Sequence, residues 1–362
     1  MTSQHWDKTP AGKHRARGLG LRLPGTPGDC NAVTDVAGVE VGYTTLIEAD
    51  HVRTGVTGLL PRGRSDAGTP CMAGTYSLNG NGEMTGTIWI EEIGELQTPI
   101  TITNTSSCGV TRDATLRWLV QNGIGTDQDW GLPVAAETYD GDLNDINGFH
   151  VTAEHAMAAL DNAASGPLEM GSVGGGTGMC TYEFKAGSAS ASRLVGIGAA
   201  QYTVGTFVQS NFGLRAELTV LGVPVGRELA GGEFRPKGSG SIIAIVATDA
   251  PLLPHQCKRL ARRVPLGLAR TGTISHHSSG DIFLAFSTAN AEALGAGGGM
   301  RHLTALADSD LDPLFQSVVE TVEEAVLDAM IANDAMTGRN GLTVPALPHD
   351  DLLRVLKAAG KV

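Results

Sequence analysis

The sequence predicts a mixed α/β fold in which helices cover buried β-sheet. From about Asp29 onward the chain alternates short β-like runs with a few clear helices. The runs 242–247 and 282–286 are short and continuously apolar, a pattern typical of strands that are buried on both faces. Glycine accounts for 49 of the 362 residues, about 13.5% against a usual level of roughly 7%. That excess indicates tight turns, close-packed backbones and a site built partly from main chain.

Enrichment in β-branched and aromatic residues predicts further strands at 87–90, 100–103, 216–220 and 223–225. Leu221 and Gly222 between the last two predict a hairpin turn. Periodicity alone leaves open whether the strands form one sheet or two. The first 28 residues are rich in Gly, Pro, Lys and Arg, which predicts an arm or peripheral loop.

Helices are predicted where apolar residues recur at helical spacing. Asp312 and Pro313 give an N-cap followed by proline at the first helical position, and we expect that helix to end near Gly338. A second helix is predicted at 253–264, with its basic residues toward the C-terminal end, where they complement the helix dipole. We interpret this basic run as a solvated helix face. Two more helices are expected near 111–121 and 152–163.

Composition and charge exclude several classes of protein. The formal net charge is −12 and the pI is about 5.3, which argues against a nucleic-acid partner and against an anionic membrane surface. Five cysteines without CxxC spacing indicate neither a disulfide framework nor a thiolate zinc site, so a reducing compartment fits best. The N-terminus lacks an apolar signal segment, and no run of about 18 apolar residues occurs. We therefore expect a soluble cytoplasmic protein.

The common cofactor and metal motifs are absent from the sequence. There is no GxxxxGK[ST], HExxH or GxSxG. The glycine-rich stretches 171–178 and 295–299 lack the strand–turn–helix setting of a dinucleotide site. The adjacent His276 and His277 cannot place both rings on one face of a strand. We expect no metal ion and no organic cofactor.

The segment 236–251 carries the strongest chemical signal, because it sets the sequence GSGS directly against a predicted core strand. Alone, GSGS is typical of a loop or linker. The sharper hypothesis is a chain break between Gly240 and Ser241, which would leave Ser241 as a new N-terminus. A free α-amine has a pKa of about 7.7 to 8.0 and can serve as general base to its own hydroxyl. Gly240 would tolerate the backbone angles of such a site. Ser239 is a competing serine that composition does not exclude.

Several further blocks accompany this segment: 31–39, 137–141, 143–147, 208–213 and 279–283. Together with GSGSIIAIVATDAPL they resemble the L-aminopeptidase/D-esterase and β-peptidyl aminopeptidase family of self-processing hydrolases, over nearly the whole chain. The resemblance implies a four-layer αββα sandwich, similar to N-terminal nucleophile hydrolases but with different connectivity. It also implies cleavage into a larger segment, 1–240, and a smaller one, 241–362, which stay together as one globular domain, commonly in a homotetramer of such pairs.

The same resemblance implies a role for each matching residue at the point of cleavage. Ser241 would be the nucleophile. Ser279 would hydrogen-bond this nucleophile or its amine, and Asp281 would orient and charge that network, although some family members have Glu at this position. Two residues apart, Ser279 and Asp281 share a face of an extended segment. Judged locally, both are ordinary turn residues before a strand.

Other matching residues are implied to bind the substrate. Asn211 resembles an oxyanion donor, although locally it is a turn asparagine. Glu137 resembles the acid that grips the substrate's free amine, and Tyr139 would lie beside the pocket, where its hydroxyl would add to the oxyanion site or simply pack. The run 174–176 would let backbone pass close to the site or form a flexible loop.

The function expected from these residues is that of a self-cleaving serine aminopeptidase. It would remove the N-terminal residue from short peptides, amides or esters through an acyl-enzyme on Ser241, with β-amino, L-α-amino and D-amino residues left open as substrates. One alternative is an acyltransferase of the ornithine acetyltransferase type. Such enzymes use a threonine within a sequence similar to Ala-Thr-Met, which Gly240-Ser241-Ile242 does not match. The other is an unprocessed, non-catalytic ligand-binding protein.

Overall fold

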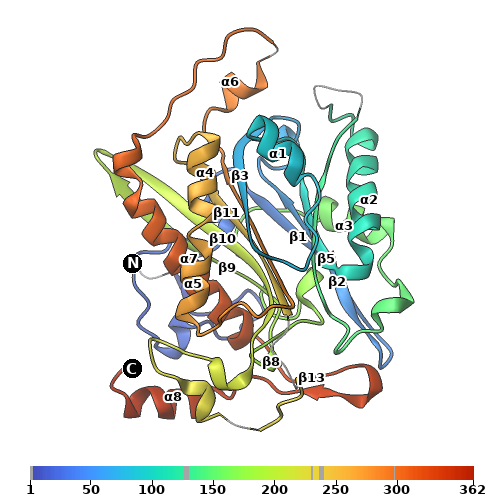
Figure 1. Ribbon diagram of the computed structural model, residues 1–362, viewed down its shortest axis with the longest axis vertical. Coiled ribbons are helices and arrows are strands. Elements are labelled where there is room, and N and C mark those ends of the chain that lie inside the picture. The colour runs from blue at the N-terminus through green and yellow to red at the C-terminus, as the bar shows by residue number, and fades with distance from the viewer. Residues whose placement is uncertain (1–2, 126–129, 230, 236–239, 297) are drawn as a thin grey trace.

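The structure, a computed structural model, describes residues 3–125, 130–229, 231–235, 240–296 and 298–362. Two β-sheets pack face to face and helices cover both outer faces, giving the four layers αββα (Figure 1). This arrangement confirms the predicted sandwich and answers the question of one sheet or two.

The smaller sheet has four strands in the order β1-β2-β5-β6. They are β1 (Glu40–Glu48), β2 (Val52–Leu60), β5 (Ile100–Asn104) and β6 (Val134–Thr138). Neighbours are antiparallel except β5 and β6, which run parallel. Helices α2 (Cys108–Gln121) and α3 (Ala153–Asp161) cover its outer face.

The larger sheet has six strands in the order β4-β3-β12-β11-β10-β9. They are β3 (Cys71–Gly80), β4 (Glu95–Leu96), β9 (Ser188–Ile197), β10 (Ala200–Phe212), β11 (Gly240–Thr248) and β12 (Ser279–Ser287). Here β11 and β12 run parallel, and β10 and β3 flank them antiparallel. Helices α4 (Pro254–Ala261), α5 (Val264–Arg270) and α7 (Asp312–Ile331) cover its outer face.

The remaining elements are short or peripheral. They are the helices α1 (Thr87–Ile93), α6 (Ala291–Gly295) and α8 (His349–Ala358), and the two-residue strands β7 (Cys180–Thr181), β8 (Phe184–Lys185), β13 (Met336–Thr337) and β14 (Thr343–Val344).

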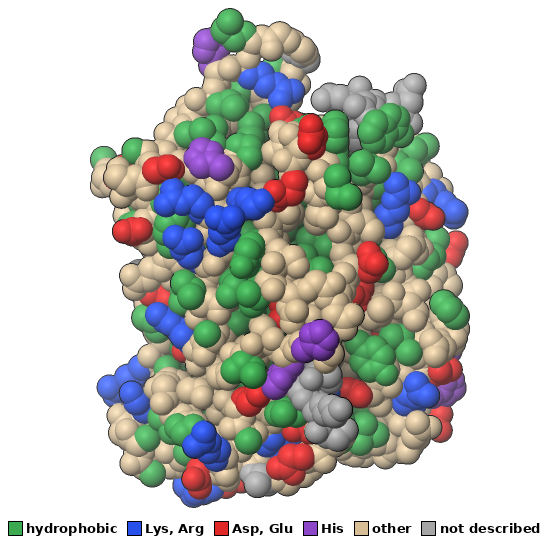
Figure 2. Space-filling view, viewed as in Figure 1, with side chains coloured by type: hydrophobic (Ala, Val, Ile, Leu, Met, Phe, Trp, Pro, Cys, Tyr) green, Lys and Arg blue, Asp and Glu red, His purple; other side chains and the backbone are tan. Residues whose placement is uncertain are grey.

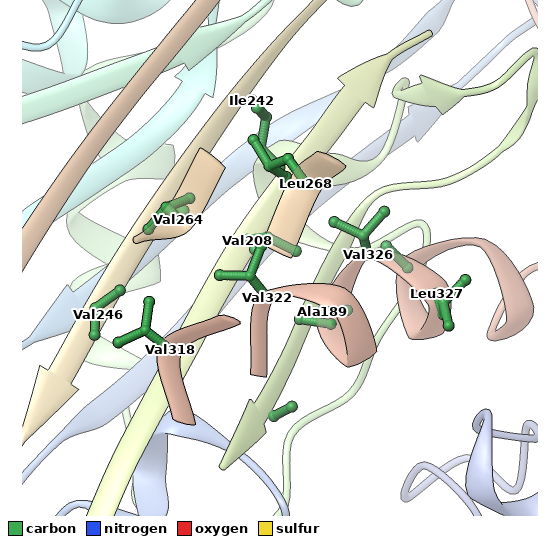
Figure 3. Packing of buried hydrophobic residues seen from close by; sticks show 14 of the residues in the cluster. Ala189, Val208, Ile242, Val246, Val264, Leu268, Val318, Val322, Val326 and Leu327 are labelled. Atoms are coloured by element: carbon green, nitrogen blue, oxygen red, sulfur yellow. The ribbon is translucent and has the colours of Figure 1, made fainter. Parts of the chain in front are cut away.

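The hydrophobic core follows the alternation of side chains along the central strands. In β11, Ile243 and Ile245 point into the core between the two sheets, whereas Ile242 and Val246 point toward the helices. Figure 3 shows these two residues packed among side chains of α5 and α7. Because both faces are buried, β11 and β12 must be apolar throughout their middle, as the sequence predicts.

Most predicted elements are confirmed, and the strand expected at 87–90 is wrong. That stretch begins α1, bounded by Gly86 and Gly94, both at φ +75°. Gly94 donates its N–H to the carbonyl of Ile90, which closes the last helical turn. Only Ile90 of this helix is buried, and Ile88 is 88% exposed. Backbone capping by the glycines therefore outweighs the local preference for strand.

The strand pair expected at 216–225 is reduced to a single bridge between Val220 and Val223. The turn itself is confirmed, since Leu221 and Gly222 both have positive φ. Upstream, Glu217 accepts the N–H of Leu214 and closes a 3₁₀ turn in place of the first strand.

Two predicted helices end earlier than expected. α7 stops at Ile331, not near Gly338, because the Asn333 side chain caps the carbonyl of Ala329. The helix expected at 253–264 is broken into α4 and α5, since Pro265 can neither donate an N–H to the preceding turn nor fit against its carbonyl.

The basic residues of α4 and the stretch after it are partly solvated and partly paired. Figure 2 shows Lys and Arg side chains gathered over the position of α4, with acidic side chains beside them. Lys258 pairs with Glu91 and Arg259 with Asp308, while the Arg263 guanidinium lies over the Phe315 ring. The prediction of a solvated face therefore holds, with local acidic partners added.

The N-terminal segment is anchored in the core at a few buried residues, whereas its composition predicts a peripheral arm. Arg15 is 1% exposed and pairs with the equally buried Asp328 of α7 at 2.8 Å. Arg17 forms an ion pair with Glu324, and Arg193 of β9 forms a second ion pair with the same carboxylate. Burial alone would raise the pKa of Glu324, but these arginines hold it down to about 2. The buried acids of α7 thus hold the stretch around Arg15 and Arg17 in place.

Within the described residues, no helix has the length and apolar character needed to cross a membrane.

Replacing Arg15 by Met is expected to lower the free energy of unfolding by about 3–5 kcal/mol, because it leaves the Asp328 carboxylate buried without its partner. Urea unfolding measures this change. Lys13→Met is the matched control from the same segment: its partner Asp334 is largely exposed, so the change stays below about 1 kcal/mol. Equal effects for the two variants would contradict the anchoring role of Arg15.

Candidate active site

A pocket of about 470 Å³ opens at one edge of the sandwich. The carboxyl ends of β3, β5, β6 and β10 meet there with the first residues of β11 and the residue that precedes β12. Its lining residues are Gly80, Asn81, Gly82, Glu83, Thr105, Glu137, Tyr139, Asn211, Arg235, Gly240, Ser241 and Ser278. Five residues singled out in the sequence therefore line one cavity, although they come from three strands and the turn after one of them.

Ser241 lies at the start of β11, between Asn211 of β10 and Gly280 of β12 in the strand register. Its hydroxyl donates to the carbonyl oxygen of Gly240 at 2.7 Å and accepts the N–H of Gly280 at 3.2 Å. The side chain is buried at the pocket wall. The nucleophile candidate is thus held against the carbonyl group that precedes it in the chain.

Gly240 occupies a position that only glycine can take. Its φ is +139°, and a Cβ atom there would lie 2.1 Å from the carbonyl oxygen of Asn211. The close approach of β10 to the start of β11 therefore depends on this glycine. Ser239, the competing serine, lies outside the described residues.

Ser279 and Asp281 lie on β12, next to Ser241 but outside the pocket lining. The Ser279 hydroxyl donates to Asp281 at 2.6 Å, and Gly280 between them provides the N–H that reaches Ser241. Burial raises the pKa of Asp281, and hydroxyl groups of Ser279 and Ser275 oppose that shift. Its second carboxylate oxygen is buried without a partner among the described residues.

The side-chain amide of Asn211 has a fixed orientation. Its oxygen accepts the N–H of Cys180 at 2.9 Å and the Arg235 guanidinium at 3.0 Å, while its nitrogen donates to the carbonyl of Tyr139 at 2.7 Å. These three bonds fix which end of the amide is oxygen. The Tyr139 ring is 45% exposed and packs over Gly141, so it forms a half-open wall.

Glu137 is a buried carboxylate at the carboxyl end of β6. It accepts the N–H of Glu83 at 2.9 Å and the hydroxyl of Thr105. Burial raises its pKa above the ordinary value of 4.5; these two hydrogen bonds oppose the shift, and the negative charge of Glu83 adds to it. Glu137 therefore presents a buried carboxyl group, held by two hydrogen bonds, at the pocket wall.

Sequence reasoning missed seven of the twelve lining residues, among them Glu83, Thr105 and Arg235, which act on Glu137 or Asn211. Thr105 lies two residues after the predicted strand 100–103, in a region where polar residues often serve a site. Arg235 immediately precedes the 236–251 segment, but nothing in its sequence context marks it. The run 174–176 lies behind the site instead of in its wall, with Gly175 packed against Ile102 and Gln209.

Among the described residues, no group of three or more His, Cys, Asp or Glu side chains lies close enough together to hold a metal ion. The five cysteines are free thiols.

Comparison with known proteins decides the family. The model of peptidase family S58 matches residues 31–344. The chain belongs to peptidase family S58. It is therefore a hydrolase of the aminopeptidase type, and the acyltransferase and the non-catalytic alternatives lose their support.

Similar proteins agree with this assignment. A β-peptidyl aminopeptidase BapA from Sphingosinicella microcystinivorans is 48% identical, with 95% of this chain and 92% of that protein covered. A solved L-aminopeptidase D-Ala-esterase/amidase from Ochrobactrum anthropi, described as a prototype serine aminopeptidase and a variant of the Ntn hydrolase fold, is 47% identical with a TM-score of 0.91 over 96% of this chain and 99% of that one. A β-aminopeptidase from Burkholderia sp. is 46% identical, with a TM-score of 0.88 over 96% and 99%. These similarities confirm the predicted family and fold of this S58 chain.

The pKa of Glu137 is expected to respond with opposite signs to changes in its two neighbours. Thr105→Val removes a hydrogen bond to the ionised form and raises the pKa further, whereas Glu83→Gln removes a like charge and lowers it. NMR titration of ¹³C-labelled glutamate, assigned with Glu137→Gln, measures both shifts. Because the folded-state pKa is raised, ionisation of Glu137 makes the folded state less stable as the pH rises through that value. Shifts of the same sign would show that these contacts do not set the pKa.

Proposed function

We propose that this S58 peptidase cleaves its own chain between Gly240 and Ser241, and that Ser241 then acts as an N-terminal nucleophile. The observation that carries the proposal is the 2.7 Å contact of the Ser241 hydroxyl with the Gly240 carbonyl in the uncut chain. The Gly280 N–H fixes the hydroxyl from the other side. The hydroxyl thus lies beside the carbonyl group whose carbon it would attack, so little further ordering is needed to bring the two together.

Self-cleavage would proceed in two steps, the formation of an ester and its hydrolysis. The Ser241 oxygen attacks the Gly240 carbonyl carbon, its proton passes to the Ser241 amide nitrogen, and the C–N bond breaks to leave an ester and a free amine. Water then hydrolyses the ester, which yields the Gly240 carboxylate and restores the Ser241 hydroxyl. The new amine is both the N-terminus of the smaller segment and the base of the mature site.

The two segments would stay together because the cut lies inside the six-stranded sheet. After cleavage β11 remains paired with β10, and β12 with β3, so strands of the smaller segment are flanked by strands of the larger one. Segments 1–240 and 241–362 would therefore form one globular domain.

In the mature site, the Ser241 amine takes the hydroxyl proton as the oxygen attacks the first carbonyl of the substrate. The oxyanion receives the second N–H of the Asn211 amide, whose first N–H is bound to Tyr139. The protonated amine gives its proton to the leaving group. The neutral amine then takes a proton from a water molecule, which attacks the acyl-enzyme and releases the acyl group. Ser279 would hydrogen-bond this amine, and Asp281, one of whose buried oxygens has no partner among the described residues, would balance the charge that forms on it.

The substrate would be a short peptide, amide or ester that carries a free amine. Glu137 supplies the partner for that amine at a fixed place in the pocket, which limits attack to the carbonyl nearest the substrate's N-terminus. The relatives named β-peptidyl aminopeptidase support N-terminal β-amino residues as substrates, and the L-aminopeptidase D-Ala-esterase/amidase supports L- and D-amino compounds.

We also propose a cytoplasmic location, which the cysteine usage supports, and a homotetramer of cleaved pairs, which the family resemblance supports. Four chains of 37.5 kDa give a particle of about 150 kDa, which light scattering would detect.

Intact mass under denaturing conditions tests self-cleavage. We expect two fragments of about 25 and about 13 kDa, in proportion to their lengths in the 37.5 kDa chain, with the smaller beginning at Ser241. Ser241→Ala should stay uncut, and Ser239→Ala, the matched control, should be cut like the wild type. A single 37.5 kDa species from active protein would refute the amine-as-base mechanism.

Glu137→Gln tests the recognition of the amine. Loss of a hydrogen bond between charged groups is expected to raise KM about 10- to 100-fold for substrates with a free amine. Glu83→Gln should change KM much less, because the Glu83 side chain is exposed. The KM of each variant is measured from initial rates on an amide with a free amine and on the same amide with that amine acetylated. Equal turnover of the two substrates by wild type would contradict this role for Glu137.

A further inference from the structure

Arg235 makes a set of contacts at the active site that the reaction scheme does not use. Its side chain is 5% exposed and lines the pocket. One guanidinium nitrogen donates to the Asn211 amide oxygen at 3.0 Å and to Asp142 at 2.7 Å, and a second reaches Asp142 at 3.2 Å. The third donates to the Cys180 carbonyl at 3.1 Å. All three nitrogens are therefore bound within the protein.

We propose that Arg235 is a positioning residue that holds the Asn211 amide with its second N–H, the one not bound to Tyr139, toward the oxyanion. This rests on the proposed role of Asn211 as oxyanion donor. The amide has two orientations half a turn apart, and only one presents N–H to the pocket. In the other, the amide oxygen would face the developing negative charge, and Arg235 and Cys180 would face an amide nitrogen with no acceptor for their hydrogens.

The charge of Arg235 gives it an effect beyond orientation. A cation bonded to the amide oxygen draws electron density toward that oxygen, so the N–H groups become stronger donors. Asp142, whose side chain is 25% exposed, pairs with the guanidinium and lowers the cost of burying its charge. The contact to Asn211 thus combines a fixed geometry with a favourable field at the site of the oxyanion.

The contact does not depend on the peptide bond that cleavage would break. Arg235 and Asn211 both belong to the larger segment, and the Arg235 backbone N–H donates to the buried Glu183 at 2.7 Å. The neighbouring Phe234 N–H binds the same carboxylate oxygen. Arg235 is therefore anchored on its N-terminal side, upstream of the 236–240 stretch, and it would support Asn211 both before and after cleavage.

A double-mutant cycle tests the proposal on the full chain. Arg235→Met is expected to lower kcat about 10- to 100-fold and to change KM less than about 3-fold. This decrease in kcat is smaller than the roughly 10²–10³-fold decrease expected for Asn211→Ala, which removes the donor itself. In the Asn211→Ala background the Arg235→Met effect should shrink below about 3-fold. Arg235→Lys keeps a charge and a donor and should recover part of the loss. Where a variant is cut incompletely, the same ratios are taken from the rate of self-cleavage, followed by intact mass.

Arg62→Met is the matched control. Arg62 is also a buried arginine, but it binds the carbonyls of Pro70, Thr288 and Ala289 at the opposite end of the sheets, so kcat per folded molecule should not change. A full Arg235→Met effect in the Asn211→Ala background, or a rise in KM in place of the fall in kcat, would overturn the positioning role. Normal kcat in Asn211→Ala alone would instead refute the proposed oxyanion donor, and an uncut active wild type would refute the self-cleavage.

Discussion

The pairing of β11 between β10 and β12 is the constraint on which the rest of the structure depends. β11 is buried on both faces, so its middle must be apolar, and its register fixes what lies beside Ser241 near its start. That register places Asn211 on one side of Ser241 and Gly280 on the other. The backbone ladder, which every residue of the strand shares, thus positions the nucleophile candidate without help from its own side chain.

Close backbone approach is the second requirement at this point. A Cβ atom at Gly240 would lie 2.1 Å from the carbonyl oxygen of Asn211. A Cβ atom at Gly280 would lie 2.5 Å from the carbonyl oxygen of Asn81, on the loop after β3. Glycine at these places allows a hydroxyl, a carbonyl and a backbone N–H to meet in a space that any side chain would fill. The high glycine content of the chain therefore has a local meaning at the site, beyond its use in turns.

Polar groups at the site are held by many internal contacts because burial makes an unpaired group costly. Asn211 has three partners, and the Glu137 carboxylate accepts two hydrogen bonds. The pocket also separates its charges: Glu137 is buried at the end of β6, while Arg235 lies next to Asn211, neutralised by Asp142. The proposed partner of the substrate's amine and the proposed oxyanion donor are thereby kept apart in one cavity, which would suit a substrate with a positive amine next to a carbonyl that becomes negative.

The sequence by itself determined the strands whose burial requires continuous apolar residues, 242–247 and 282–286, and the helices with a long regular apolar stripe. It also indicated the family, through blocks such as 208–213 and 279–283 that accompany the 236–251 segment. It failed where a neighbour decides the local structure: two glycines make 87–93 a helix, Pro265 divides another, and the acids of α7 draw the N-terminal segment into the core. Only the tertiary structure decided that Glu83, Thr105 and Arg235 join the pocket, since contacts between residues far apart in sequence leave no periodic trace in the chain.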